Sequence, residues 1–253
     1  MIEFNVKIAE ETAKIRCRYP SNHAFFKAYL TDEPESFVIE PTEDDIRLIA
    51  ANFQKMVQKR GEKSRDYGGF FYENNAIHSL LTAELLKRGV LLIHGAAIAV
   101  DGQAYLFTAR SGTGKSTHTR LWRELFGSRV TMINDDKPLL RPTKNGVTVY
   151  GTPWDGGEGL NTNTQAPLKA IIKLERGEEN SIRPLKTSEM IPEFFAASLR
   201  GQTSLEITHS MDLQSRILSA VKLYSMKCTP TIDAARVAAK ALGISFTSFM
   251  PHF

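Results

Sequence analysis

A glycine-rich stretch at residues 109–116 has the residue types and spacing of a phosphate-binding loop. It reads ARSGTGKS, which fits the Walker A pattern with alanine at the first position. Small residues let backbone N–H groups converge on phosphate oxygens, and a helix that follows directs its amino end at the same anion. The residues expected to contact a nucleotide are Ser111, Gly112, Thr113, Gly114, Lys115, Ser116 and Thr117. Within this set, Lys115 would reach the β- and γ-phosphates and the Ser116 hydroxyl would bind Mg²⁺.

Two adjacent acids follow the apolar run VTMIN, about 20 residues beyond the loop lysine. Asp135 and Asp136 are therefore predicted at the carboxyl end of a strand, where open α/β sheets place their ligands. One carboxylate could hold a metal ion, with Asp136 as a metal-site candidate, while the other accepts a proton from an attacking hydroxyl. Which aspartate is the base stays open. A surface turn is the alternative, because the sequence Asp-Asp-Lys-Pro also favours a turn.

Two histidines near the loop are interpreted differently. His94 ends the apolar run VLLIH and is a catalytic candidate, although a structural role at a strand end fits the sequence equally well. His118 lies on the helix predicted after the loop, and we expect it on the surface.

A second glycine-rich stretch, GTPWDGGEG at residues 151–159, is predicted to line the site, with a surface loop as the alternative. Glu158 is a candidate for a metal contact, and Trp154 could be a substrate platform or part of the core. Arg183, Lys186 and Arg200 are later cations that could face a transferred phosphate. None of the three lies in a recognisable motif, and Arg200 is better explained as a cation at a helix end.

The elements that must position these residues can be predicted from apolar spacing and turn signals. Two apolar runs surround Asp101-Gly102, a strong hairpin dipeptide, and the second run leads directly into the glycine loop. A helix is predicted over residues 115–126 with Gly127 as its stop, followed by a strand at 130–134. Strand, glycine loop, helix, strand and acids form the order of a mononucleotide-binding unit.

Downstream, the sequence predicts a hairpin turning at Asn145-Gly146, a buried strand at 168–176, and helices at 187–199, 210–226 and 231–242. Residues 1–40 favour short strands. Thr42 and Asp45 form a capping-box pattern before a helix that ends near Gly61, and a second helix is expected over 73–88 with Gly89 as its stop. We therefore expect an α+β region at 1–85 and an α/β nucleotide-binding domain at 86–253.

Composition excludes several classes of protein. The 253-residue chain has a net charge of +4, spread along the sequence, which gives no support to nucleic-acid binding. Cys17 and Cys228 are far apart, which argues against a disulfide scaffold or a zinc site. Neither a signal peptide nor an apolar run of about 18 residues is found, so we expect a cytoplasmic protein that does not bind membranes.

The combination IHGAAIAVDGQAYLFTARSGTGKST with NDD at the next strand end resembles HPr kinase/phosphorylase and its small relatives, over residues 89–140. Those relatives share a nucleotide-binding core with ATP-dependent phosphoenolpyruvate carboxykinase. The resemblance implies a P-loop core with a mixed sheet and a kinase that uses ATP and Mg²⁺ to phosphorylate a hydroxyl, often of serine. It also implies that Asp135 or Asp136 accepts the proton, and that His94 supports the acids or the transferred phosphate.

The chain departs from the bifunctional enzymes in two places. Residues 1–85 do not match their amino-terminal domain, and their glycine- and arginine-rich signature after the acids is missing. The acceptor, a protein, a peptide or a small molecule, is therefore open, as is the oligomeric state, with a homo-oligomer among the alternatives. The functional hypothesis is a kinase. Its alternatives are a nucleotide-binding regulatory protein without phosphotransfer and a carboxykinase-like enzyme.

Overall fold

The computed structural model describes residues 1–63, 65–110, 112–199, 201 and 203–246. The chain divides into two compact units, Met1–Arg88 and Gly89–Phe253. The division lies three residues beyond the expected end of the amino-terminal region at residue 85. Within the described residues, no helix combines the length and the apolar character needed to cross a membrane.

The first unit is a small sheet with helices. Strand β1 pairs antiparallel with β2, and β3 joins β2 in parallel. The elements are β1 (Ile2–Ile8), β2 (Glu11–Cys17), α1 (Ser21–Phe25), the 3₁₀ turn η1 (Lys27–Tyr29), β3 (Phe37–Ile39), α2 (Glu43–Lys59) and α3 (Gly69–Lys87). The short strands predicted for residues 1–40 are therefore confirmed, with a helical segment between the second and third.

The helix signals of this unit are confirmed with one difference. Thr42 caps α2 by accepting from the Asp45 N–H at 3.2 Å, while the Asp45 carboxylate accepts from the Thr42 N–H at 2.8 Å. Helix α3 ends before Gly89, as expected, but it begins at Gly69 instead of Glu73. Glu73 is buried in its second turn, where its carboxylate accepts from three donors of the segment that follows β2. These bonds offset the cost of burying the carboxylate.

The second unit is built on one curled, mixed sheet with the order β4-β8-β9-β10-β6-β5-β7, and β12 and β11 extend it from β10. Its strands are β4 (Leu91–Leu92), β5 (Ala96–Val100), β6 (Gln103–Thr108), β7 (Val130–Asn134), β8 (Leu139–Thr143), β9 (Gly146–Tyr150), β10 (Gln165–Arg176), β11 (Ser181–Pro184) and β12 (Lys222–Cys228). Strand β10 connects the two parts of the sheet, because its first residues pair with β9 and its later ones pair with β6 and β12.

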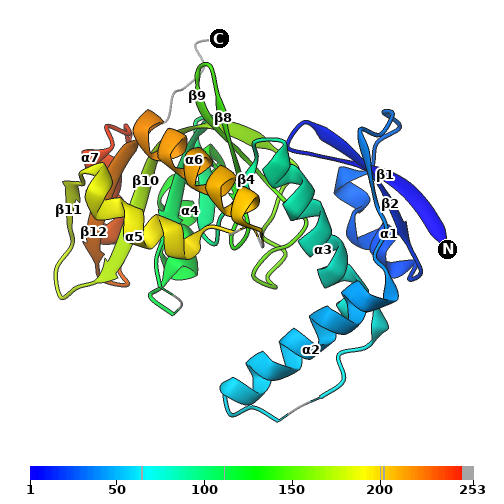
Figure 1. Ribbon diagram of the computed structural model, residues 1–253. Helices are drawn as coiled ribbons and strands as arrows, with labels where there is room; N and C mark the ends of the chain where they lie inside the picture. Colours follow the sequence, from blue (N-terminus) through cyan, green and yellow to red (C-terminus); the bar gives the residue numbers. More distant parts are fainter. Residues whose placement is uncertain (64, 111, 200, 202, 247–253) are drawn as a thin grey trace. The chain divides into compact units, whose positions relative to one another are not determined.

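Helices cover both faces of this sheet (Figure 1). They are α4 (Lys115–Phe126), α5 (Thr187–Ala197), α6 (Ser204–Ala220) and α7 (Ile232–Ala241), with the 3₁₀ turn η2 (Gly127–Arg129) after α4. Beneath α4 and α7 lies a core that includes Phe107, Trp122, Ile172 and Met226. Burial of these large apolar side chains is the main driving force that fixes α4, and hence the loop before it, against the sheet.

The predicted order of strand, loop, helix, strand and acids is present as β6, α4 and β7, but the two strands are not neighbours. Strand β5 lies between them and pairs antiparallel with both. The hairpin that joins β5 to β6 turns at Asp101 and Gly102, whose φ angles of 50° and 75° are those of a type I′ turn. Consequently the start of β5 and the ends of β6 and β7 meet at one edge of the sheet.

One helix prediction is wrong in its second half. Residues 210–226 were expected to be one helix, but α6 ends at Ala220 and residues 222–228 form β12. This strand pairs in parallel with β10 along its whole length, and Leu223 and Met226 are buried. Non-local pairing in the sheet interior outweighs the helical spacing of the apolar residues.

Candidate functional site

Three of the predicted groups of the second unit lie at this edge of the sheet. His94 precedes β5, residues 109–116 follow β6, and Asp135 and Asp136 follow β7. Gly95 allows the start of β5 to approach β6 closely, since a Cβ at this position would lie 3.0 Å from the Phe107 carbonyl oxygen. Its N–H also donates to the Asp136 carbonyl oxygen at 3.0 Å. Backbone contacts therefore hold His94 beside the acids.

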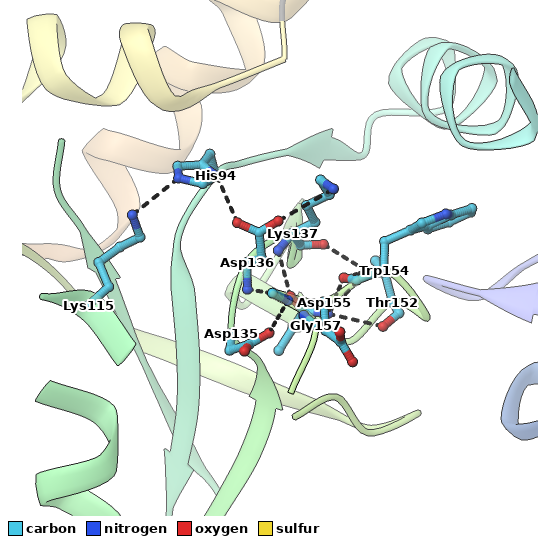
Figure 2. A network of polar contacts seen from close by, with 11 residues as sticks. His94, Lys115, Asp135, Asp136, Lys137, Thr152, Trp154, Asp155 and Gly157 are labelled. Atoms are coloured by element: carbon cyan, nitrogen blue, oxygen red, sulfur yellow. Dashed lines mark hydrogen bonds and ion pairs between the residues drawn. The ribbon is translucent and has the colours of Figure 1, made fainter. Parts of the chain in front are cut away.

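Lys115, His94 and Asp136 form a chain of polar contacts (Figure 2). The Lys115 Nζ lies 3.2 Å from His94 Nε2, and His94 Nδ1 lies 3.0 Å from Asp136 Oδ1. A carboxylate can only accept, so Nδ1 carries the proton, and Nε2 can accept from the ammonium of Lys115. The imidazole of His94 thus bridges the amino group of Lys115 and the carboxylate of Asp136.

Asp136 is held as a carboxylate. The hydrogen bond from His94 lowers the pKa of Asp136 to about 2, against the opposing effect of burial, and the charge of Lys137 at 3.4 Å adds to the lowering. A carboxylate with such a low pKa is a poor proton acceptor but a good ligand for a cation. Its stabilising effect is present above the ordinary pKa of 3.8 and is lost as the pH falls towards 2.

His94→Ala is expected to raise the pKa of Asp136 towards its ordinary value, because the strongest donor to this carboxylate is removed. One pKa unit is equivalent to 1.36 kcal/mol, so the variant should lose about 2 kcal/mol of unfolding free energy at neutral pH, and less as the pH approaches 2. NMR titration of the aspartate carboxyl carbons measures the pKa directly. His209→Ala, on α6, is the control. A pKa that stays near 2 in His94→Ala would contradict the assigned cause.

Asp135 has a different environment. Its side chain is buried at 6% exposure, and one carboxylate oxygen accepts from the Gly156 N–H at 2.8 Å. Burial raises the pKa of Asp135, and the nearby charges of Asp155 and Asp136 act in the same direction. A raised pKa favours proton uptake. The two adjacent acids therefore differ in pKa. Asp135 is suited to accept a proton, and Asp136 is suited to bind a cation.

Asn134 organises the loops around the acids, a role that sequence reasoning did not anticipate. Its Nδ2 donates to the carbonyl oxygens of Thr152 and Trp154 at 3.0 and 2.9 Å, and its Oδ1 accepts from the N–H groups of Asp136 and Lys137 at 2.9 and 2.5 Å. The residue is fully buried between the strand end and the second glycine-rich stretch. A single amide thereby fixes the path of both segments.

Asn134→Asp is expected to destabilise the protein by about 3–5 kcal/mol at neutral pH, since a carboxylate oxygen would face the two carbonyl oxygens that now accept from Nδ2. Urea unfolding gives the free energy of unfolding. Asn145→Asp, in the exposed β8–β9 turn, is the matched control and should change it by less than about 0.5 kcal/mol. Equal stabilities of the two variants would show that the Asn134 contacts do not fix the loops.

The predicted phosphate loop is partly described. Gly112 and Gly114 have φ angles of 76° and 116°, a region that glycine adopts without strain, and α4 begins at Lys115. Ser116 is exposed at the helix start and Thr117 is half-buried. An Arg176 guanidinium nitrogen donates to the Gly112 carbonyl oxygen at 2.6 Å and so links the end of β10 to the loop. Ser111 lies outside the described residues.

Other candidates do not join this cluster. Glu158 is exposed in the second glycine-rich stretch. Trp154 is buried, which favours the core alternative. Arg183 pairs with Glu189 at 2.9 Å, and Arg200 lies outside the described residues.

The prediction for His118 is wrong, because this side chain is buried at 2% exposure. Its Nε2 accepts from the Trp122 indole N–H at 3.0 Å, and its ring contacts Phe107 edge-on. His118 lies one turn before Trp122 on the same face of α4, so it follows the helix's apolar stripe into the core.

The residues present fit a nucleotide with its metal better than a metal held by protein alone. Among the described residues, no group of three His, Cys, Asp or Glu side chains could hold a metal ion. Mg²⁺ in phosphate-transfer sites is commonly held by one or two protein oxygens together with substrate phosphates and water. The exposed Ser116 hydroxyl and the Asp136 carboxylate are oxygen ligands of the required kind.

Comparisons with known proteins give little further information. No family model matches the chain, and no curated protein matches it. One similar solved structure is that of the Hpr(Ser) kinase/phosphatase from Coxiella burnetii, with 14% sequence identity and a TM-score of 0.35, covering 60% of this chain and 97% of the other. A likeness this weak assigns no activity and no site residue to the chain. The mixed α/β architecture rests on the strand pairing itself.

Proposed function

We propose that this protein is an ATP- and Mg²⁺-dependent kinase that phosphorylates a hydroxyl, of the seryl type, on a protein, a peptide or a small molecule. The observation that carries the proposal is the chain Lys115–His94–Asp136 beside the buried Asp135. A cation next to a phosphate loop, a carboxylate fixed as an anion and a second carboxylate with a raised pKa are the groups that phosphoryl transfer to an alcohol requires.

Each residue has a distinct role in this proposal. Lys115 and the N–H groups at the start of α4 would bind the phosphate oxygens, and Ser116 and Asp136 would hold the metal ion. Mg²⁺, when bound, supplies positive charge that offsets charge on the transferred group. Asp135 would accept the proton of the acceptor hydroxyl. At the same time the hydroxyl oxygen would form a bond to the γ-phosphorus, and the bond between that phosphorus and the β–γ bridging oxygen would break, so that ADP leaves. His94 is a positioning residue, because it acts through Asp136.

The test combines nucleotide binding with a search for the acceptor. Calorimetry with ATP, in the presence and absence of Mg²⁺, measures binding, and transfer from γ-labelled ATP to a panel of peptides and small alcohols measures catalysis. The expected result is Mg²⁺-dependent binding and a phosphorylated hydroxyl. Binding without any phosphorylated acceptor would favour a regulatory protein, and nucleotide-linked decarboxylation of oxaloacetate would favour a carboxykinase. Absence of ATP binding would refute the proposed kinase.

A further inference from the structure

A cavity of about 430 Å³ opens beside the predicted phosphate loop. One wall is formed by the loop and the first two turns of α4, and the other by the residues that follow β10 and β12. The lining includes Gly112, Thr117, His118, Leu121, Cys228 and Pro230. Its volume is within the roughly 300–1,000 Å³ of small-molecule sites. It lies on the α4 side of the loop, apart from the His94 and Asp136 cluster.

His118, one of the residues that line this cavity, has a ring nitrogen without a hydrogen-bond partner among the described residues. Because its Nε2 accepts from Trp122, the ring proton is on Nδ1. Nδ1 is buried and has no hydrogen-bond partner among the described residues. Buried donors are nearly always paired in native proteins, so this one points to a partner outside the chain.

The rest of the lining suits an uncharged ring system. Leu121, Pro230 and the Cys228 thiol offer apolar surface, and the Thr117 hydroxyl and loop backbone offer polar contacts. Arg176 is the cation of the wall, and its bond to the Gly112 carbonyl joins the cavity to the loop that is proposed to hold phosphates. A ligand bound to both would therefore carry phosphates at one end and a ring at the other.

We propose that this cavity binds the base and ribose of the nucleotide, with the His118 Nδ1–H as a donor to an acceptor atom of that nucleoside. The inference rests on the proposed binding of ATP and adds the place and chemistry of nucleoside recognition. It predicts that affinity for nucleotides depends on His118, whereas affinity for bare polyphosphate does not.

Thiol footprinting tests the location without any need for activity. The sequence has two cysteines: Cys228 is half-buried at the cavity wall, and Cys17 is buried in the first unit and serves as the internal control. N-ethylmaleimide is applied at a fixed alkaline pH, because burial raises the pKa of Cys228. Mass spectrometry then measures the rate of modification. Saturating ATP or ADP should slow modification of Cys228 by about tenfold, while tripolyphosphate should change it by less than about twofold.

Calorimetry on the same samples separates this proposal from the proposed function. If ATP binds and Cys228 is not protected, the cavity is not the nucleoside site, and the kinase proposal is unaffected. Equal protection by tripolyphosphate would also overturn the inference. If ATP does not bind at all, both proposals fail.

A second measurement addresses His118 itself and does not depend on the reactivity of Cys228. His118→Phe should weaken ATP binding by about tenfold and leave tripolyphosphate affinity within about twofold. His209→Phe, on α6, is the matched control, and circular dichroism verifies that each variant is folded. A parallel loss of affinity for ATP and tripolyphosphate, or no loss for either, would overturn the role of His118. A His118→Phe chain that does not fold leaves the footprinting result to decide.

Discussion

Asp135→Asn is expected to slow phosphoryl transfer by about 10²–10⁴-fold while ATP affinity changes by less than about twofold. The substitution keeps the size of the side chain and an oxygen that can accept from the Gly156 N–H. It removes the group that would take the acceptor proton. The measurement is turnover with an acceptor found in the phosphorylation screen, alongside calorimetry with ATP.

Two further variants make this prediction specific. Glu158→Gln alters an exposed acid of the neighbouring glycine-rich stretch and should leave turnover nearly unchanged. Asp136→Asn should weaken the Mg²⁺ dependence of ATP binding, because Asp136 is assigned to the metal. If Asp135→Asn retained full turnover and Asp136→Asn lost it without a change in Mg²⁺ dependence, the roles of the two acids would have to be exchanged.

Lys115→Met should lower turnover by about 10²–10³-fold and also weaken ATP binding. Burial lowers the pKa of Lys115, and the charges of Asp136 and Glu193 oppose that effect. The ammonium is thus kept in a partly desolvated position, where its attraction to phosphate is stronger than in water. Methionine keeps the length and apolar stem of the side chain but not its charge.

The control for Lys115→Met is Lys144→Met, which removes a lysine from the exposed β8–β9 turn. ATP titrations and turnover should be the same for this control and the unmodified protein. An undiminished ATP affinity in Lys115→Met would show that the phosphates do not bind where we propose. Such a result would leave the folded arrangement of His94 and Asp136 unexplained by phosphate chemistry.

Features set by neighbouring residues could be predicted from the sequence. The capping box at Thr42, the hairpin at Asp101-Gly102 and the helix stop at Gly127 each depend on side chains or backbone angles within a few residues. Asp-Gly predicts a hairpin because a type I′ turn needs positive φ at both positions. The placement of His94, the loop and the acids at one sheet edge follows from these local elements once the strands are paired.

Features set by distant residues could not be predicted in this way. The pairing of β12 with β10 converts a segment with helical spacing into a strand. The sequence gives no sign that β5 lies between β6 and β7, because the choice of neighbouring strand depends on the whole sheet. The Asn134 contacts also join segments 18 to 20 residues apart. The burial of His118, in contrast, could have been predicted from the sequence. Its i, i+4 spacing from Trp122 places both side chains on the same face of the helix.

The position of β5 has a consequence for how such a site could change over evolution. Strands β6 and β7 are separated by two inter-strand steps, or roughly 9–10 Å at the usual spacing. Backbone hydrogen bonds set this gap, so it is insensitive to substitutions in the loops at the strand ends. The loops could therefore diversify towards new acceptors while the span from phosphate donor to acidic pair stayed constant. In the proposed kinase, the choice of acceptor and the distance between phosphate donor and acids would thus be set by separate parts of the chain.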